Sequence, residues 1–137
     1  MKRLFLDTTV LVHAAGGTHP LREPSRSLVE LARSGTLELH VSTEAIQEFL
    51  FHRLRRTDAA AAVLDARDAA AFCRVHAFDA SVLDRSIDLV EITNLRGRDA
   101  VHAATAQVQG FSAIVSADRD FDGIPGLTRV GPADAAV

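Results

Sequence analysis

The chain has 137 residues, a length typical of one domain, and its 47% hydrophobic content excludes disorder by composition. The formal net charge of −3 excludes binding to polyanions through bulk positive charge. The single cysteine, Cys73, can form no intrachain disulfide, and no apolar run approaches the ~20 residues of a membrane-spanning helix. We therefore expect a cytoplasmic protein without membrane contact, with one domain over residues 1–131 and a flexible tail over 132–137.

The first half of the chain alternates short apolar strands with helices. Residues 4–6 predict a buried strand, and residues 10–15 predict a short helix that stops at a glycine pair. A longer helix is expected over 20–34, and residues 37–41 alternate like a second strand. Ser42 suits the N-cap of the next helix, whose apolar stripe runs to about residue 54.

The second half continues the same alternation. Thr57 or Asp58 caps an alanine-rich helix that reaches about Phe72, and Asp79 caps another helix. The remaining expected elements are a weak strand over 75–78, a polar loop over 94–98, a helix over 99–109, a buried strand over 111–116, a loop over 118–126 and a strand over 127–130.

This alternation predicts the fold class α/β, with a central and mostly parallel sheet covered by helices on both faces in three layers, α/β/α. Ligands bind beyond the carboxyl ends of the strands in such folds. Asp7 and Asp118 follow predicted strands, so both belong at that edge. Asp99 opens a helix and Glu48 lies about a turn and a half into another, so both can reach the same place.

Four acids at one edge would repel each other unless cations joined them, and hard divalent cations prefer carboxylate oxygens. Asp7, Asp99 and Asp118 are the predicted metal ligands, and the possible additional ligands are Glu48, Asp120 and Thr9. Each has a simpler interpretation as a helix cap, a loop residue or an exposed charge. Glu44 competes with Glu48, although a first-turn acid is already favoured by the helix dipole.

Other polar residues near these acids are open to two interpretations. Asp122 can add charge to the edge or be an ordinary loop residue. His102 lies one turn beyond Asp99, and we expect a packed or hydrogen-bonded imidazole there rather than a metal ligand. Arg53, Arg56 and Arg98 are candidate contacts to an RNA backbone, since arginine binds phosphate in a bidentate manner, but a solvated surface explains them as well.

Several motifs occur in a characteristic order along the chain. An N-terminal strand is followed by Asp7-Thr8-Thr9, a mid-chain helix carries Glu48-Phe49, a helix begins Arg-x-x-Asp-Ala at Asp99, and Ser-x-Asp-x-Asp-Phe surrounds Asp118. Together they resemble the PIN-domain ribonucleases, and most closely the VapC toxins of bacterial toxin–antitoxin pairs. The resemblance extends from Lys2 to about Val130.

The resemblance implies a PIN-like fold and an endoribonuclease that depends on Mg²⁺ or Mn²⁺ and hydrolyses RNA with a metal-activated water. The family's catalytic acidic quartet matches Asp7, Glu48, Asp99 and Asp118. The resemblance also implies a cognate VapB-like antitoxin that covers the active site, a homodimer, and a toxin–antitoxin hetero-oligomer.

Three other functions fit the sequence less well. A receiver-like signalling domain needs a late lysine, and this chain has none after Lys2. A haloacid-dehalogenase-like phosphatase needs a second aspartate two residues after Asp7, where Thr9 stands. A catalytically silent RNA-binding or scaffold PIN-like domain is the remaining alternative, and nothing favours it because all four acids are present.

Overall fold

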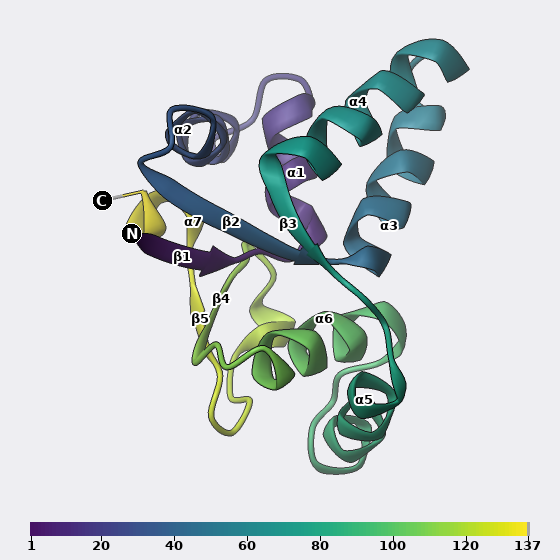
Figure 1. Cartoon of the computed structure of the whole chain (residues 1–137), viewed down its shortest axis with the longest axis vertical. Coiled ribbons are helices and arrows are strands. Elements are labelled where there is room, and N and C mark those ends of the chain that lie inside the picture. Colours follow the sequence, from purple (N-terminus) through teal and green to yellow (C-terminus); the bar gives the residue numbers. More distant parts are fainter. Residues whose placement is uncertain (137) are drawn as a thin grey trace.

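A computed structural model describes residues 1–136 and shows a three-layer α/β/α arrangement around a parallel sheet (Figure 1). The strands are β1 Lys2–Phe5, β2 Leu37–Ser42, β3 Cys73–His76, β4 Ala113–Val115 and β5 Thr128–Val130. Strand β2 pairs in parallel with β1 and β3, and β4 pairs in parallel with β5. A parallel bridge between Leu6 and Val115 joins the two groups, which gives the order β3-β2-β1-β4-β5. The predicted fold class is confirmed.

Helices cover both faces of this sheet. Helices α1 to α4 lie on one face, and α5 and α6 lie on the other (Figure 1). Among residues 1–136, none of the helices combines the length and the apolar character needed to cross a membrane. The helices are α1 Thr8–Ala15, α2 Arg22–Arg33, α3 Thr43–Leu54, α4 Ala59–Phe72, α5 Ala80–Ile92, α6 Gly97–Val108, the 3-10 helix η1 Arg119–Phe121 and α7 Pro132–Ala135.

Each face of the sheet buries its own hydrophobic cluster. Leu37, Leu39 and Val41 alternate along β2 and pack into the cluster that includes residues of α1, α2, α3 and α4. On the other face, Phe5 and Ile114 pack with the small residues of α6. The buried alanines of α6 let this helix lie close against the sheet. Its first turn is thereby held near the carboxyl ends of the strands.

The predicted helix caps are largely confirmed. The side chains of Ser42, Asp58 and Asp79 each accept a hydrogen bond from a backbone N–H in the first turn of the following helix. These bonds satisfy backbone donors that the helix itself leaves unpaired. Asp7 caps α1 in the same way, so this acid has a structural contact in addition to any chemical role.

Most element boundaries differ from those predicted by one or more residues, and two differences bear on the site. Strand β3 occupies Cys73–His76 rather than residues 75–78, because α4 runs directly into the strand and parallel pairing places Cys73 opposite Leu39. Helix α6 begins at Gly97, so the predicted polar loop over 94–98 is shorter. The consequence for the site is that the residues just before Asp99 already belong to a helical turn.

The C-terminal segment also differs from the predicted flexible tail over 132–137. Residues Pro132–Ala135 form α7, in which Pro132 and Ala135 are buried. The ammonium group of Lys2 donates a hydrogen bond to the carbonyl of Ala135 at 3.2 Å. Burial of these apolar groups beside α2 orders a segment whose sequence has little helical pattern. Val137 lies outside the described residues, and the single domain over 1–131 stays a prediction.

Candidate metal centre

Asp7 lies at the point where the strand order of the sheet reverses. Chain connections lead from β1 to β2 on one side, and β4 lies on the other side. The backbone N–H of Asp7 donates to the carbonyl of Val115 at 3.1 Å, which fixes the residue between β1 and β4. Open α/β sheets bind ligands at this position. The sequence prediction that Asp7 lies at the carboxyl edge of the sheet agrees with this geometry.

The carboxylate of Asp7 is almost fully buried, with 2% of the residue exposed. Its Oδ1 accepts hydrogen bonds from the backbone N–H of Thr9 at 3.0 Å and from the Thr9 hydroxyl at 2.5 Å. Its Oδ2 accepts a hydrogen bond from the Ser116 hydroxyl at 2.7 Å. Burial nevertheless raises the pKa of Asp7 to about 6, against the effect of these bonds and of His102. Holding this charge inside the protein is therefore costly, and a nearby cation would offset the cost.

Three further carboxylates converge beside this position. Asp99 comes from the first turn of α6, Asp118 caps η1, and Asp120 lies within η1. One carboxylate oxygen from each lies within 4.8 Å of the other two. Asp99 and Asp118 are half-buried and Asp120 is exposed, so the group opens toward solvent. Asp120, which the sequence left as a possible fifth member, is placed in this group.

The charge of these acids is concentrated enough to affect the titration of Asp99. Burial raises the pKa of Asp99, and the charges of Asp118, Glu48 and Asp120 raise it further, while His102 opposes the shift. Carboxylates at such distances destabilise each other unless a proton or a cation lies between them. All the donors here are oxygens, which fits a hard divalent cation such as Mg²⁺ or Mn²⁺ better than a thiolate-seeking or imidazole-seeking metal.

Asp7 and Glu48 lie outside the 4.8 Å group, yet each is connected to it. Ser116 joins Asp7 to Asp118, because its hydroxyl donates to Asp7 and accepts a hydrogen bond from the backbone N–H of Asp118 at 2.9 Å. Glu48 is close enough to Asp99 for its charge to raise the pKa of that carboxyl. The four acids predicted from the sequence thus surround one place, and their roles as metal ligands stay predictions.

Glu48 is held by a buried hydrogen-bond network. The Nε2 of His102 lies 2.6 Å from Glu48 Oε1, and the Thr8 hydroxyl donates to the same oxygen at 3.0 Å. The Nδ1 of His102 lies 2.7 Å from the hydroxyl of Ser42. Because an ionised carboxylate can only accept, the imidazole carries a proton on Nε2 and donates it to Glu48. His102 is the hydrogen-bonded histidine expected from the sequence.

This network decides the charge state of Glu48. Burial alone would raise the pKa of Glu48, but the hydrogen bond and the electrostatic attraction of His102, the hydrogen bond from Thr8 and the charge of Arg98 outweigh it, so the pKa is lowered. Glu48 is therefore ionised at neutral pH and fixed in position. Glu44, its competitor in the sequence, forms no hydrogen bond or ion pair with the described residues, and the geometry favours Glu48.

The structure separates the remaining candidates. Asp122 pairs with Arg129 at 2.7 Å and does not belong to the acidic group. Arg53 pairs with Asp65 at 3.0 Å, on the side of α3 that faces α4. Of the candidate RNA contacts, Arg98 alone affects the titration of a site acid. Arg53 and Arg56 line a separate pocket.

Sequence reasoning missed three hydroxyl residues that position the acids: Thr8, Ser42 and Ser116. All three are buried. Thr8 and Ser116 lie beside Asp7 and Asp118 in the motifs that were noted, and Ser42 was interpreted only as a cap. Their proximity to acids at strand ends was the available signal, because a buried carboxylate needs hydrogen-bond donors.

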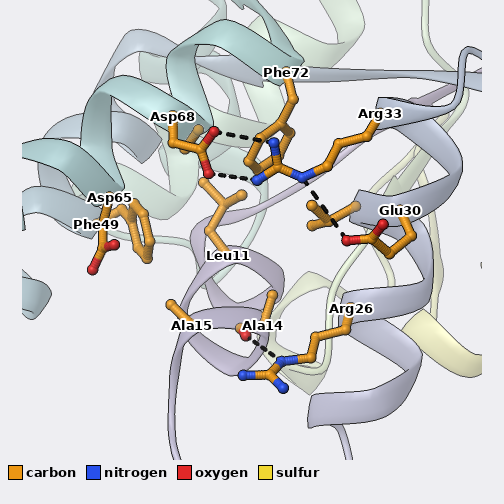
Figure 2. A pocket seen from close by; sticks show the side chains of 12 residues that line it. Leu11, Ala14, Ala15, Arg26, Glu30, Arg33, Phe49, Asp65, Asp68 and Phe72 are labelled. Atoms are coloured by element: carbon orange, nitrogen blue, oxygen red, sulfur yellow. Dashed lines mark hydrogen bonds and ion pairs between the residues drawn. The ribbon is translucent and has the colours of Figure 1, made fainter.

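An apolar cavity of about 310 Å³ lies between α1, α2 and α4, away from the acidic group (Figure 2). Leu11, Phe49 and Phe72 form its apolar wall. Its carboxylates are paired: Arg33 binds Asp68, with Nη1 3.1 Å from Oδ1, and also lies 3.9 Å from Glu30. Since these acids are neutralised by arginines, this cavity is not a candidate metal site.

The parallel sheet with an oxygen-only acidic group at its carboxyl edge defines a class: α/β proteins equipped to hold a hard divalent cation at the ligand-binding edge of the sheet. The chain matches the PIN domain family over residues 4–127, and it belongs to that family. It is a homologue of the VapC ribonucleases, as the individual relatives show.

The chain is 39% identical over 143 residues to Ribonuclease VapC7 of Mycobacterium tuberculosis, covering 97% of this chain and 93% of that protein. The solved VapBC2 of Rickettsia felis, bound to a DNA fragment from its promoter, has a similar fold, with a TM-score of 0.74, 15% identity, and coverage of 94% and 98%. The Mycobacterium tuberculosis toxin VapC20, described as cleaving the sarcin-ricin loop, has a TM-score of 0.69, 20% identity, and coverage of 86% and 92%. The two solved structures support the fold.

Proposed function

We propose that this chain is the toxin of a toxin–antitoxin pair and acts as a divalent-metal-dependent endoribonuclease in the cytoplasm. The observation that carries the proposal is the convergence of Asp99, Asp118 and Asp120 within 4.8 Å, beside the buried Asp7. The similarity to VapC7 over nearly the whole chain supports the same activity. A catalytically silent RNA-binding or scaffold domain has no use for a repelling acidic group, and this argues against that alternative.

Asp7, Asp99 and Asp118 are the residues that we expect to hold Mg²⁺ or Mn²⁺, with Asp120 at the exposed side. When bound, such a cation lowers the pKa of a water and offsets charge on a phosphodiester oxygen. The protein's own part is to keep the carboxylates in place. Ser116 and Thr9 orient Asp7 through three hydrogen bonds, so little reorganisation is needed when a cation arrives.

Glu48 completes the site as a fixed, ionised carboxylate. His102 and Thr8 both donate to Oε1, which leaves Oε2 without a hydrogen bond to any of the described residues and available to orient a water. The positive charge of Arg98 lies near enough to affect Glu48 and can attract an RNA phosphate to the same place. No nucleophilic side chain is required for this reaction.

The proposed partners follow from the same electrostatics. An open acidic group is a natural target for an arginine or lysine of a VapB-like antitoxin that covers the site. The solved VapBC2 of Rickettsia felis is bound to a DNA fragment from its promoter, and this supports a toxin–antitoxin complex here. A homodimer of this chain, within a toxin–antitoxin hetero-oligomer, completes the proposal.

The direct test is incubation of the purified chain with RNA in Mg²⁺, in Mn²⁺ and in EDTA. We expect cleavage with either cation and none after chelation, because the acidic group cannot act on a phosphodiester by itself. Readdition of the cation should restore cleavage, which separates metal loss from protein damage. RNA binding without cleavage under all three conditions would instead support the silent alternative.

A second prediction concerns His102, which positions Glu48. A His102→Leu variant keeps a side chain of similar size but removes the donor to Glu48, and we expect cleavage to fall by about 10- to 100-fold. The His102→Gln variant retains a hydrogen-bond donor, and its cleavage activity should fall less. The measurement is kcat and KM for one RNA oligonucleotide. Equal losses in the two variants, or a loss explained by unfolding in circular dichroism, would contradict a positioning role.

A further inference from the structure

A basic pocket of about 670 Å³ opens between the C-terminal ends of α1 and α3, apart from the acidic group. The chain segment after α1 contributes two glycines and Thr18 to it. The side chains that give the pocket its character are His13, His19, His52, Arg53 and Arg56. No acidic residue lines this pocket among the described residues, which distinguishes it from the metal centre.

The pocket continues the line of the metal centre along two helices. On α3, His52 lies one turn after Glu48, so the two side chains share a face. Arg56 lies in the turn that follows α3 and lines the same pocket as His52. On α1, His13 lies one turn after Thr9. One helical turn spans about 5.4 Å, so along these helices the basic pocket begins one turn beyond Glu48 and Thr9. A single-stranded RNA bound over the metal centre can therefore extend between α1 and α3 into the pocket.

The pocket carries a positive field. The pKa of His52 is lowered by burial and then by the charges of Arg56, Arg53, Arg55 and His13. Arg53 is paired with Asp65 through its Nε. Arg56 is exposed and forms no ion pair with a carboxylate of the described residues. At least one guanidinium is therefore available to an anionic ligand.

The pocket also offers an aromatic surface. The imidazoles of His13 and His19 stack, with centroids 4.3 Å apart and planes inclined by 25°. The Nδ1 of His19 accepts a hydrogen bond from the backbone N–H of Leu21 at 3.1 Å, which fixes the ring. Beside them, a Cβ placed on Gly17 would meet no atom within 4 Å, so a ligand has room to approach the backbone. Stacked rings next to guanidinium groups are the combination with which proteins bind unpaired nucleotides.

We propose that this pocket is a subsite for single-stranded RNA beside the scissile phosphate, in which Arg56 binds a backbone phosphate and the His13–His19 pair stacks a base. It rests on the proposed ribonuclease function, because it names where the substrate strand runs. An acidic segment of an antitoxin would also meet the arginines. An acidic peptide segment would make no use of the stacked imidazoles, so the lining of the pocket favours RNA over an antitoxin segment.

The test measures binding of a fluorescent single-stranded RNA to the full chain in EDTA, over a series of salt concentrations at alkaline pH, where imidazoles are uncharged. Arg56→Ser should weaken binding and reduce the slope of log affinity against log salt by about 0.7, the value for one phosphate contact on a single strand. His19→Ala should weaken binding by about five-fold or more without changing the slope, because stacking releases no counterions. The matched control is Arg67→Ser, an exposed arginine of α4 outside the pocket, which should behave as wild type.

Unchanged affinity and slope in both pocket variants would overturn the subsite. So would variants that bind RNA normally but lose affinity for an antitoxin, since the pocket would then serve that partner. Cleavage assays in Mg²⁺ separate the two proposals. If the wild type cleaves no RNA, the ribonuclease assignment fails, whereas weaker RNA binding by the variants in EDTA still supports the pocket.

Discussion

An Asp99→Asn variant is expected to lose RNA cleavage by on the order of 10³-fold while keeping its fold. Asp99 is a half-buried member of the acidic group, and the charges of Asp118, Glu48 and Asp120 raise its pKa. The asparagine side chain fills the same space but carries no charge, so it binds a hard cation poorly. The substitution also removes a charge that repels its neighbours, so the stability of the fold should not decrease. The measurements are cleavage of an RNA oligonucleotide in Mg²⁺ and the circular dichroism spectrum.

Two glutamate variants make a matched comparison for this result. Glu48→Gln changes a carboxylate that His102 and Thr8 hold beside the acidic group, and we expect a strong loss of cleavage. Glu44→Gln makes the same chemical change one turn earlier on α3, where the side chain has no hydrogen bond to any of residues 1–136, and cleavage should remain close to wild type. If Asp99→Asn, Glu48→Gln and Glu44→Gln all cleave RNA as fast as the wild type, the reaction does not take place at this acidic group.

An Asp7→Asn variant is expected to be more stable than the wild type when metal is absent. Burial raises the pKa of Asp7 to about 6 from 3.8, so the ionised carboxylate costs up to about 3 kcal/mol of the free energy of unfolding. The asparagine oxygen can accept from Thr9, and its amide can donate to Ser116. The free energy of unfolding, measured by urea denaturation in EDTA near pH 7.5, should therefore rise.

The same shift gives the metal-free wild type a defined pH dependence. Because the folded pKa of Asp7 is the higher one, the folded state binds more protons than the unfolded state between pH 3.8 and about 6. The contribution of Asp7 to stability is thus fully present below pH 3.8 and is lost as the pH rises through about 6. The Asp7→Asn variant should lack this loss.

Saturating Mg²⁺ should reverse the order of stability. Binding to the folded state alone stabilises the wild type by mass action, whereas the variant lacks one of the expected ligands. Asp88→Asn on the exposed face of α5 is the control, with a side chain 63% exposed, and its stability should change little in either buffer. If the Asp7→Asn variant is less stable than the wild type in EDTA, the Asp7 carboxylate does not destabilise the metal-free fold.

Local sequence patterns predicted the elements that carry the site. Apolar runs before Asp7 and Asp118 indicated buried strands, and the helix caps at Ser42, Asp58 and Asp79 followed from residue type. These predictions worked because a strand, a cap or a glycine stop depends on neighbours close in the chain. The short motifs around the acids were sufficient to indicate the PIN domain, which the family match over residues 4–127 confirms.

Side-chain pairing across long separations was not available to the sequence. His102 and Glu48 are 54 positions apart, and periodicity alone gives each a helix face without naming the partner on it. Asp120 was a possible additional ligand and Asp122 was open to two interpretations, and only the structure separates them: Asp120 joins the acidic group and Asp122 pairs with Arg129. The ordered α7 is a similar case, because burial against a distant helix outweighed a weak local pattern.

The sequence by itself determined the α/β class, the presence of acids at the carboxyl ends of strands, and the oxygen-only chemistry that those acids offer a cation. The tertiary structure decided which acids meet, that Ser116 connects Asp7 to Asp118, and that Glu48 rather than Glu44 is held beside them. The physical reason is that local structure follows from interactions within a few residues. A metal centre requires side chains from distant segments to converge within a few ångströms, and only the packing of helices on the sheet sets that geometry.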